Sequence, residues 1–259
     1  LGAASTSELV GRADLLVQAR GAERVDLRDL LAPRGRPGER PLVPIGVGAL
    51  AAAEGALSSA DRFVATAGAG ALARARMAGL VAPLAAAATR SGIAGNGFAA
   101  YATEGIAFSL AGGAQDGAAK TALGGTVAIL KAPNAVGKFV DGAVGKCFGY
   151  GAQRGRFFVQ GGADARACIR LSGADVVFGG DLRGFAFEYM TGGTAVVLGD
   201  PGRWICAGMS GGMVFLRLDP SRGLDEAALR DRIAKSAKVT LRAPSEVEAA
   251  PLRDLLRGY

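Results

Sequence analysis

Three cysteines are the residues of this chain that are best suited to redox or metal chemistry. Cys147, Cys168 and Cys206 form no C-x-x-C pair, and the 259 residues include no histidine. Zinc sites built from Cys and His, and catalytic triads that use His, are therefore excluded. An odd number of cysteines indicates buried thiols in a reducing, cytoplasmic compartment. We predict no metal site in this chain.

Carboxylates offer a second route to chemistry, because general acid–base catalysis needs two of them to converge on one substrate. The candidates are Glu104, Asp116, Asp141, Asp164, Asp175, Asp181 and Glu188. They fall at different places in a repeat of about 19 residues, so no convergent pair is expected. Thr191 and Ser210 are equivalent hydroxyls at a turn, which we interpret as caps of backbone amides rather than nucleophiles. No catalytic residue is predicted.

Glycine-rich stretches such as Gly95, Asn96 and Gly97 raise the question of phosphate binding. A phosphate loop requires G-x-G-x-x-G between a strand and a helix, or a Gly-Lys-Ser/Thr sequence, and neither occurs here. We interpret the glycines as corners that need positive φ or close backbone approach. No cofactor-binding residue is predicted.

The glycines belong to a repeat that must position every candidate residue. A glycine precedes each of several short apolar runs, at Gly105, Gly125, Gly155, Gly173, Gly193 and Gly212. The intervals are close to 20 residues except one of 30, which carries about ten extra residues around 133–137. We interpret each unit as a strand of about five residues, a glycine turn and a second short strand. Such a period without helices is typical of a parallel β-solenoid.

Stacked coils, meaning successive turns of a solenoid, place equivalent side chains in columns at about 4.8 Å spacing. Cys168, Phe187 and Cys206 recur every 19 residues, so we expect them to form one inward-facing column. Their burial in the core is favoured over a redox role.

The expected fold is mainly β, a right-handed parallel β-helix at 80–219 with flanking helical parts. Residues 1–58 are expected to be a connector, and residues 59–79 a helix that packs on the solenoid. Residues 220–259 are expected to form a helical tail that covers the unpaired edge of the last coil. In this tail Asp225 would cap a helix that reaches Ala234, and Pro251 would interrupt a second helix between Ser245 and Leu256.

Charge and hydropathy restrict the partners. The net charge is +7, but the arginines are scattered among acidic residues without a basic block, so nucleic-acid binding is not expected. The least polar window, 77–89, is too short to span a bilayer, and no membrane association is expected. The chain starts at Leu1 without a signal-peptide pattern, which indicates a trimmed or processed end.

Two stretches, "FEYMTGGTAVVLG" and "AGMSGGMVFLRLD", resemble a known family. They are similar to the C-terminal right-handed β-helix of the glutamate synthase large subunit, the Gly-x-Gly-x-Gly domain. The resemblance is most specific at 189–193 and 208–212. It extends to "LVGRADLL" near the start and "RDRIAKSAKVTLRAPSEVEAAPLRDLL" near the end, so it covers essentially the whole chain.

The resemblance implies that the chemistry lies in partner domains, on the same or a separate chain. In the family a cysteine amidotransferase domain releases ammonia from glutamine. A synthase domain with FMN and an iron–sulfur cluster then reduces the 2-iminoglutarate formed from 2-oxoglutarate. The β-helix is implied to be a non-catalytic buttress of these domains, so FMN and the cluster are expected only in the partner.

Two alternatives remain open on the residues alone. The same fold could serve as the scaffold subunit of a related complex, such as the C subunit of formylmethanofuran dehydrogenase, a formyltransferase/hydrolase relative or an N-methylglutamate synthase. It could also be an independent enzyme that uses the concave side of the stack. An oligomer is compatible with every one of these hypotheses.

Overall fold

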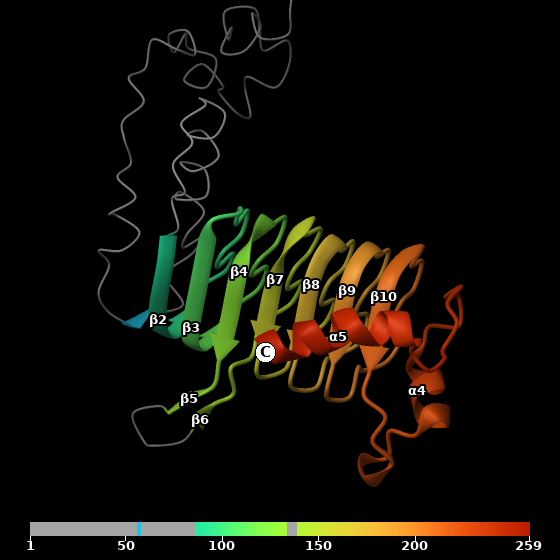
Figure 1. The fold of residues 1–259 in the computed structure, drawn as a ribbon. Coiled ribbons are helices and arrows are strands. Elements are labelled where there is room, and N and C mark those ends of the chain that lie inside the picture. Colours follow the sequence, from blue (N-terminus) through green and yellow to red (C-terminus); the bar gives the residue numbers. More distant parts are fainter. Residues whose placement is uncertain (1–55, 58–85, 134–138) are drawn as a thin grey trace, which may run out of the picture. The chain divides into compact units, whose positions relative to one another are not determined.

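The computed structural model describes residues 56–57, 86–133 and 139–259 (Figure 1). Eight strands form one sheet in the order β1-β2-β3-β4-β7-β8-β9-β10, and every neighbouring pair is parallel. The strands are β1 (Ala56–Leu57), β2 (Ala86–Ala94), β3 (Ile106–Ala114), β4 (Leu123–Leu130), β7 (Arg154–Val159), β8 (Ser172–Phe178), β9 (Thr191–Val197) and β10 (Gly211–Leu216). The chain is therefore a parallel β-solenoid of about six turns, as predicted.

Two predicted parts of the chain are not tested by this structure. The connector 1–58 contributes β1, which pairs with β2, but its other residues lie outside the described part. The helix predicted at 59–79 lies wholly outside it. The described residues belong to one of two structural units, Gly46–Tyr259. The predicted domain boundaries thus remain predictions.

The core is filled by rows of apolar side chains that point inward from the sheet. One row comprises Phe108, Val127, Phe157, Val176 and Ala195, which are in register from strand to strand and buried. β-branched and aromatic side chains favour such a strand because they pack on neighbours one coil away. The ring of Phe148, from the opposite wall, meets Phe157 and Phe178 edge-on at 6.1 and 5.7 Å. The interior is therefore a packed core.

The wall opposite the sheet corrects one prediction. Instead of a second strand, each coil has a five-residue turn segment in which the first, third and fifth residues have positive φ. We call this wall the turn face; its segments are 97–101, 117–121, 147–151, 166–170, 185–189 and 204–208. A β-strand cannot form where φ alternates in sign. Strand-like pairing is reduced to single bridges such as Val144 with Ala163.

Hydrogen bonds between coils hold the turn face. In one coil the N–H groups of Arg166 and Arg170 donate to the following coil, at 3.0 and 2.8 Å. The N–H of Cys168, between them, donates to Phe148 in the preceding coil at 2.7 Å. A positive φ costs an ordinary residue about 1–2 kcal/mol. These bonds offset that cost because they satisfy backbone groups that would otherwise be buried unpaired.

The predicted column of side chains is confirmed. Cys168 and Phe187 are fully buried and Cys206 is 4% exposed. All three are the middle residue of their turn segment, with φ of 57°, 63° and 63°. The equivalent residues of the earlier coils are Ala99, Ala119 and Gly149, which are also buried.

The long interval in the repeat forms an insertion. β5 (Ala132–Pro133) and β6 (Phe139–Val140) pair antiparallel, whereas the strands of the main sheet are all parallel. Figure 1 shows this hairpin projecting from the solenoid beyond the end of β4. The extra residues thus leave the stack, and β4 still pairs in parallel with β7.

A capping segment follows the last coil. It contains the 3-10 helix η3 (Pro220–Arg222) and α4 (Glu226–Arg232). Asp225 caps α4 as predicted, because its side chain accepts a hydrogen bond from Ala228 N–H at 2.8 Å. After α4, Ile233 pairs with Ile205 in the parallel sense. The segment therefore occupies the place of a further coil and covers the last one.

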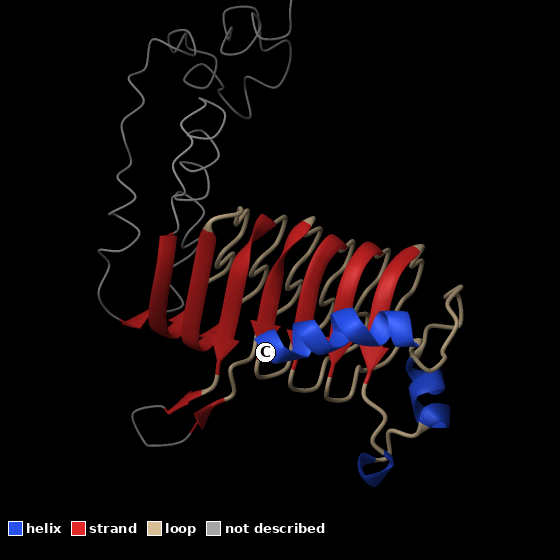
Figure 2. Cartoon of the chain, viewed as in Figure 1, coloured by secondary structure: helices blue, strands red, loops and turns tan. Residues whose placement is uncertain are grey.

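The final helix, α5 (Glu246–Gly258), differs from prediction in two respects. The helix starts at a capping box formed by Ser245 and Glu248. The first difference is that it runs through Pro251 without interruption. It also lies across the outer face of the sheet (Figure 2) rather than over the last coil. Leu252 and Leu255 pack there in a cluster with Phe158, Val177, Val196 and Phe215. This packing keeps the second half of the helix continuous with the first, although Pro251 has no backbone N–H to donate to the preceding turn.

Candidate functional site

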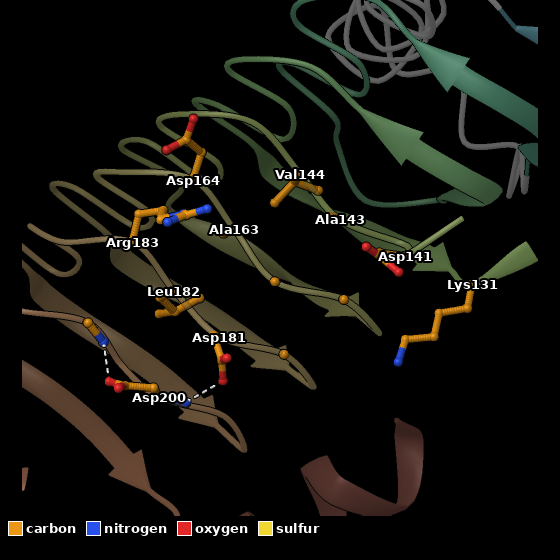
Figure 3. A pocket seen from close by; sticks show the side chains of 14 residues that line it. Lys131, Asp141, Ala143, Val144, Ala163, Asp164, Asp181, Leu182, Arg183 and Asp200 are labelled. Carbon is orange, nitrogen blue, oxygen red and sulfur yellow. Dashed lines mark hydrogen bonds between the residues drawn. The ribbon is translucent and has the colours of Figure 1, made fainter. Parts of the chain in front are cut away.

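A hollow of about 660 Å³ runs along the corner that follows the strands (Figure 3). Glycines line it because successive corners stack closely. A Cβ on Gly180 would lie 2.6 Å from the backbone of the preceding coil. The charged residues that line it are Lys131, Asp141, Asp164, Asp181, Arg183 and Asp200. This hollow is the candidate functional site, because several carboxylates line it.

The expectation that no two candidate carboxylates converge stays a prediction, although three of them line one hollow. Asp141, Asp164 and Asp181 line the same hollow, and the fourth carboxylate, Asp200, was missed by sequence reasoning. The signal for Asp200 is its spacing of 19 residues from Asp181, which places both at one position of the repeat. Four other candidates, Glu104, Asp116, Asp175 and Glu188, are not part of its lining.

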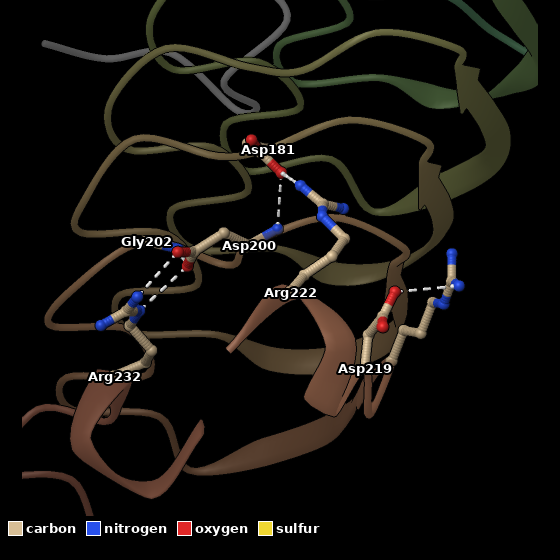
Figure 4. A network of polar contacts seen from close by, with 7 residues as sticks. Asp181, Asp200, Gly202, Asp219, Arg222 and Arg232 are labelled. Atoms are coloured by element: carbon tan, nitrogen blue, oxygen red, sulfur yellow. Dashed lines mark hydrogen bonds and ion pairs between the residues drawn. The ribbon is translucent and has the colours of Figure 1, made fainter. Parts of the chain in front are cut away.

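Asp181 and Asp200 are engaged in structural contacts (Figure 4). Asp181 Oδ1 accepts a hydrogen bond from the Asp200 N–H at 2.7 Å and pairs with Arg222 at 3.1 Å. Asp200 accepts two bonds from Arg232, at 2.9 and 2.7 Å, and one from Gly202 N–H at 2.8 Å. These bonds, chiefly the one from Arg232, hold the pKa of Asp200 below its usual value. Through Arg222 and Arg232, the two carboxylates tie the corner to the capping segment.

Other carboxylates also make structural contacts. Asp116 accepts a hydrogen bond from Lys146 N–H in the next coil at 2.8 Å. Asp219 accepts one from Ser221 Oγ at 2.6 Å and pairs with Arg217 at 3.0 Å. The hydrogen bond from Ser221 and the nearby Arg217 lower the pKa of Asp219, whereas an acid–base catalyst must exchange protons near its working pH.

The thiols are not activated. All three cysteines are free, and burial is the main cause that raises each pKa, to about 12 for Cys206. A nucleophilic cysteine needs a lowered pKa. Cys168 and Cys206 are also two coils apart, roughly 10 Å, with Phe187 between them. They do not fit an iron–sulfur cluster, whose thiolates must converge on one group of atoms.

No three His, Cys, Asp or Glu side chains of the described residues are placed to hold one metal ion. Similarly, no helix in the described part of the chain is long and apolar enough to cross a membrane.

Thr191 and Ser210 occupy equivalent positions but do not act as predicted. Their backbone N–H groups donate to the preceding coil, to Leu171 and Met190, at 2.9 Å each. Both residues are exposed. The backbone amide of each residue makes the contact rather than its side-chain hydroxyl, because at this corner the chain enters the hydrogen-bond ladder of the parallel sheet.

The fold and these contacts define a class of protein: a parallel β-solenoid whose polar groups hold coils together. Residues 48–258 match the family model described as the GXGXG motif, so the chain belongs to this family.

The similar proteins are glutamate synthases. Ferredoxin-dependent glutamate synthase 2, chloroplastic, of Arabidopsis thaliana is 35% identical over 172 residues, 66% of this chain and 10% of that protein. The ferredoxin-dependent enzyme of Pyropia yezoensis is 36% identical over 171 residues, 65% of this chain and 10% of that protein. The glutamate synthase [NADPH] large chain of Bacillus subtilis is 38% identical over 128 residues, 49% of this chain and 8% of that protein.

The chain thus spans about a tenth of the length of the curated relatives that it matches. It is homologous to their GXGXG region, which confirms the resemblance seen in the sequence. The alternative of a scaffold in a formylmethanofuran dehydrogenase, formyltransferase/hydrolase or N-methylglutamate synthase complex gains no support from these relatives.

Proposed function

We propose that this chain is the structural, non-catalytic β-helix part of a glutamate synthase-type enzyme. That enzyme would transfer the amide nitrogen of glutamine to 2-oxoglutarate and form glutamate, a step of ammonia assimilation. The observation that carries the proposal is the match of residues 48–258 to the GXGXG family together with the glutamate synthase relatives.

The contacts within the chain support a structural role. Buried apolar side chains fill the interior of the described coils. Asp181 and Asp200, in the corner hollow, are bound to arginines of the capping segment. Burial raises the pKa values of the thiols, which disfavours the reactive thiolate form. A rigid body of this kind can hold two active domains at a fixed separation.

The flavin and the iron–sulfur cluster would be carried by a synthase domain, and glutamine would be hydrolysed in an amidotransferase domain. Both domains would lie on the same chain or on a partner subunit. Cys168 and Cys206 are buried in the core column of this chain, and we place the cluster in the synthase domain. Neither nucleic acid nor a membrane is part of the proposed function.

We also propose a reducing compartment, the cytoplasm in the simplest case, because the cysteines are free and Cys168 and Cys206 are buried. Three of the relatives have names that include the word chloroplastic.

Purification of the native protein under mild conditions tests the proposal. The chain should be recovered with, or be continuous with, a polypeptide that shows flavin and iron–sulfur absorption in the visible range. Recovery with a formyltransferase, or as a lone colourless chain that turns over a substrate, would overturn it.

A further inference from the structure

Three aromatic side chains stand exposed on the turn face of the last two coils. Phe185 is 38% exposed, Tyr189 56% and Trp204 52%. We call these three residues the aromatic ridge. Large apolar groups that are exposed together, rather than singly, mark contact surfaces.

The ridge is held rigidly. The rings of Phe185 and Trp204 stack with centroids 5.0 Å apart and planes 26° from parallel. The N–H of Phe185 donates to Arg203 at 2.9 Å and that of Tyr189 to Ala207 at 2.8 Å, so both backbones are fixed to the next coil. An interface residue that is already ordered loses little conformational entropy on binding.

Neighbouring glycine and arginine residues fix Tyr189 further. A Cβ on Gly208 would lie 2.6 Å from the Tyr189 ring, so this glycine makes room for the ring to lie over the next coil. The guanidinium of Arg170 lies 5.6 Å from the ring centroid, within the range of a cation–π contact.

Two hollows flank Trp204. A hollow of about 400 Å³ lies between the Phe185–Trp204 pair and the segment 234–236. Another of about 500 Å³ lies on the side of Arg203 and Arg230. Projecting rings beside hollows that can accept side chains are the arrangement found at the centre of protein interfaces.

Charged residues border the ridge. Arg170, Arg203 and Lys235 form no ion pair with described residues. Glu188 and Asp231 are the carboxylates among the residues that line the two hollows. The border therefore has an excess of cations, and a matching surface would present apolar side chains to the hollows and carboxylates to the cations.

We propose that the aromatic ridge is the surface on which the catalytic part of the glutamate synthase-type enzyme docks. The inference rests on the proposed function. The relatives are about ten times longer than this chain, so a large body of additional protein must be accommodated. The outer face of β7–β10 is already covered by α5, whereas the ridge includes Trp and Tyr and is bordered by arginines, the residue types enriched in interface hot spots.

Site-specific photo-cross-linking on the whole native protein tests this docking surface. p-Benzoylphenylalanine replaces Trp204 in one variant and Tyr189 in another. The matched control carries it at Val247 on α5, which is 83% exposed. We expect cross-links from positions 204 and 189 to peptides of the synthase or amidotransferase domain, and none to those domains from position 247. If the domains are separable subunits, Trp204→Ala should weaken their association at least about tenfold and Val247→Ala should leave it unchanged.

Several results would overturn the inference. They are cross-links confined to residues 1–259 of the same chain, cross-links to a second copy or to nucleic acid, and no cross-link at all. Glutamate formation is measured on the same preparations. An active enzyme without these cross-links rejects the docking surface alone, whereas a preparation that forms no glutamate rejects the proposed function.

Discussion

The guanidinium of Arg232, the last residue of α4, donates two hydrogen bonds to the carboxylate of Asp200, at the corner after β9. The side chains are only 19% and 30% exposed, respectively. The pair therefore links the capping segment to the stack at a site that is partly shielded from water. Because the capping segment occupies the place of a further coil, this link helps to close the end of the solenoid.

Removing that link should destabilise the chain. Arg232→Met leaves a partly shielded carboxylate without its main partner, and we expect the free energy of unfolding to fall by about 1–2 kcal/mol. Arg230→Met is the matched control, because its pair with Glu226 is 60% and 70% exposed and is worth less than about 0.5 kcal/mol. Urea unfolding followed by circular dichroism measures both; equal effects would contradict the prediction.

The start of α5 should lose stability between about pH 4.5 and pH 2. Hydrogen bonds from Arg242 and Ser245 lower the pKa of Glu248 to about 2. Since the folded-state pKa lies below the unfolded value, this contribution to stability is complete above about pH 4.5 and is lost as the pH falls towards 2. Carboxyl ¹³C NMR should give a Glu248 midpoint near pH 2, and Arg242→Met should raise it. A midpoint unchanged by that substitution would contradict the assignment.

The second glycine of the "MTGG" motif should not tolerate a side chain. Gly193 has a φ of +86°, and a Cβ there would overlap the carbonyl oxygen of Ala174 in the preceding coil. We expect Gly193→Ala to cost roughly 2–4 kcal/mol in the free energy of unfolding. At Gly151 φ is +63°, but no atom lies within 4 Å of the position that a Cβ would take, so Gly151→Ala should cost only about 1 kcal/mol. Similar losses would show that close stacking is not the cause.

Thiol reactivity should report the buried column. Cys168 and Cys206 are buried, whereas Cys147 is partly exposed at the edge of its turn segment. Alkylation of the native protein with iodoacetamide should therefore modify Cys147 first, and the other two only after unfolding. Mass spectrometry of the digested protein identifies the modified residues. Early modification of Cys168 would place its column at the surface.

The period and the inward column could be predicted from the sequence. Glycines at intervals near 20 residues mark the corners, and the spacing of Cys168, Phe187 and Cys206 determines which side chains stack. The cap residue Asp225 could also be predicted, because capping depends on residues within one helical turn.

The turn face and the corner hollow could not be predicted. Positive φ is not a preference of the residue types at Arg166, Phe185 and Trp204. No local sequence signal therefore predicts it, because hydrogen bonds between coils impose it. The contact of Asp200 with Arg232 joins residues 32 positions apart on different elements. Spacing within the repeat does not contain such information.

Glutamate formation tests the central claim most directly. The native assembly that contains this chain is supplied with glutamine, 2-oxoglutarate and a reductant, and a separate preparation of residues 1–259 is assayed in parallel. We predict glutamate formation by the flavin-containing assembly and no turnover by residues 1–259 alone. Turnover by residues 1–259 alone, or an intact assembly that forms no glutamate, would contradict the account.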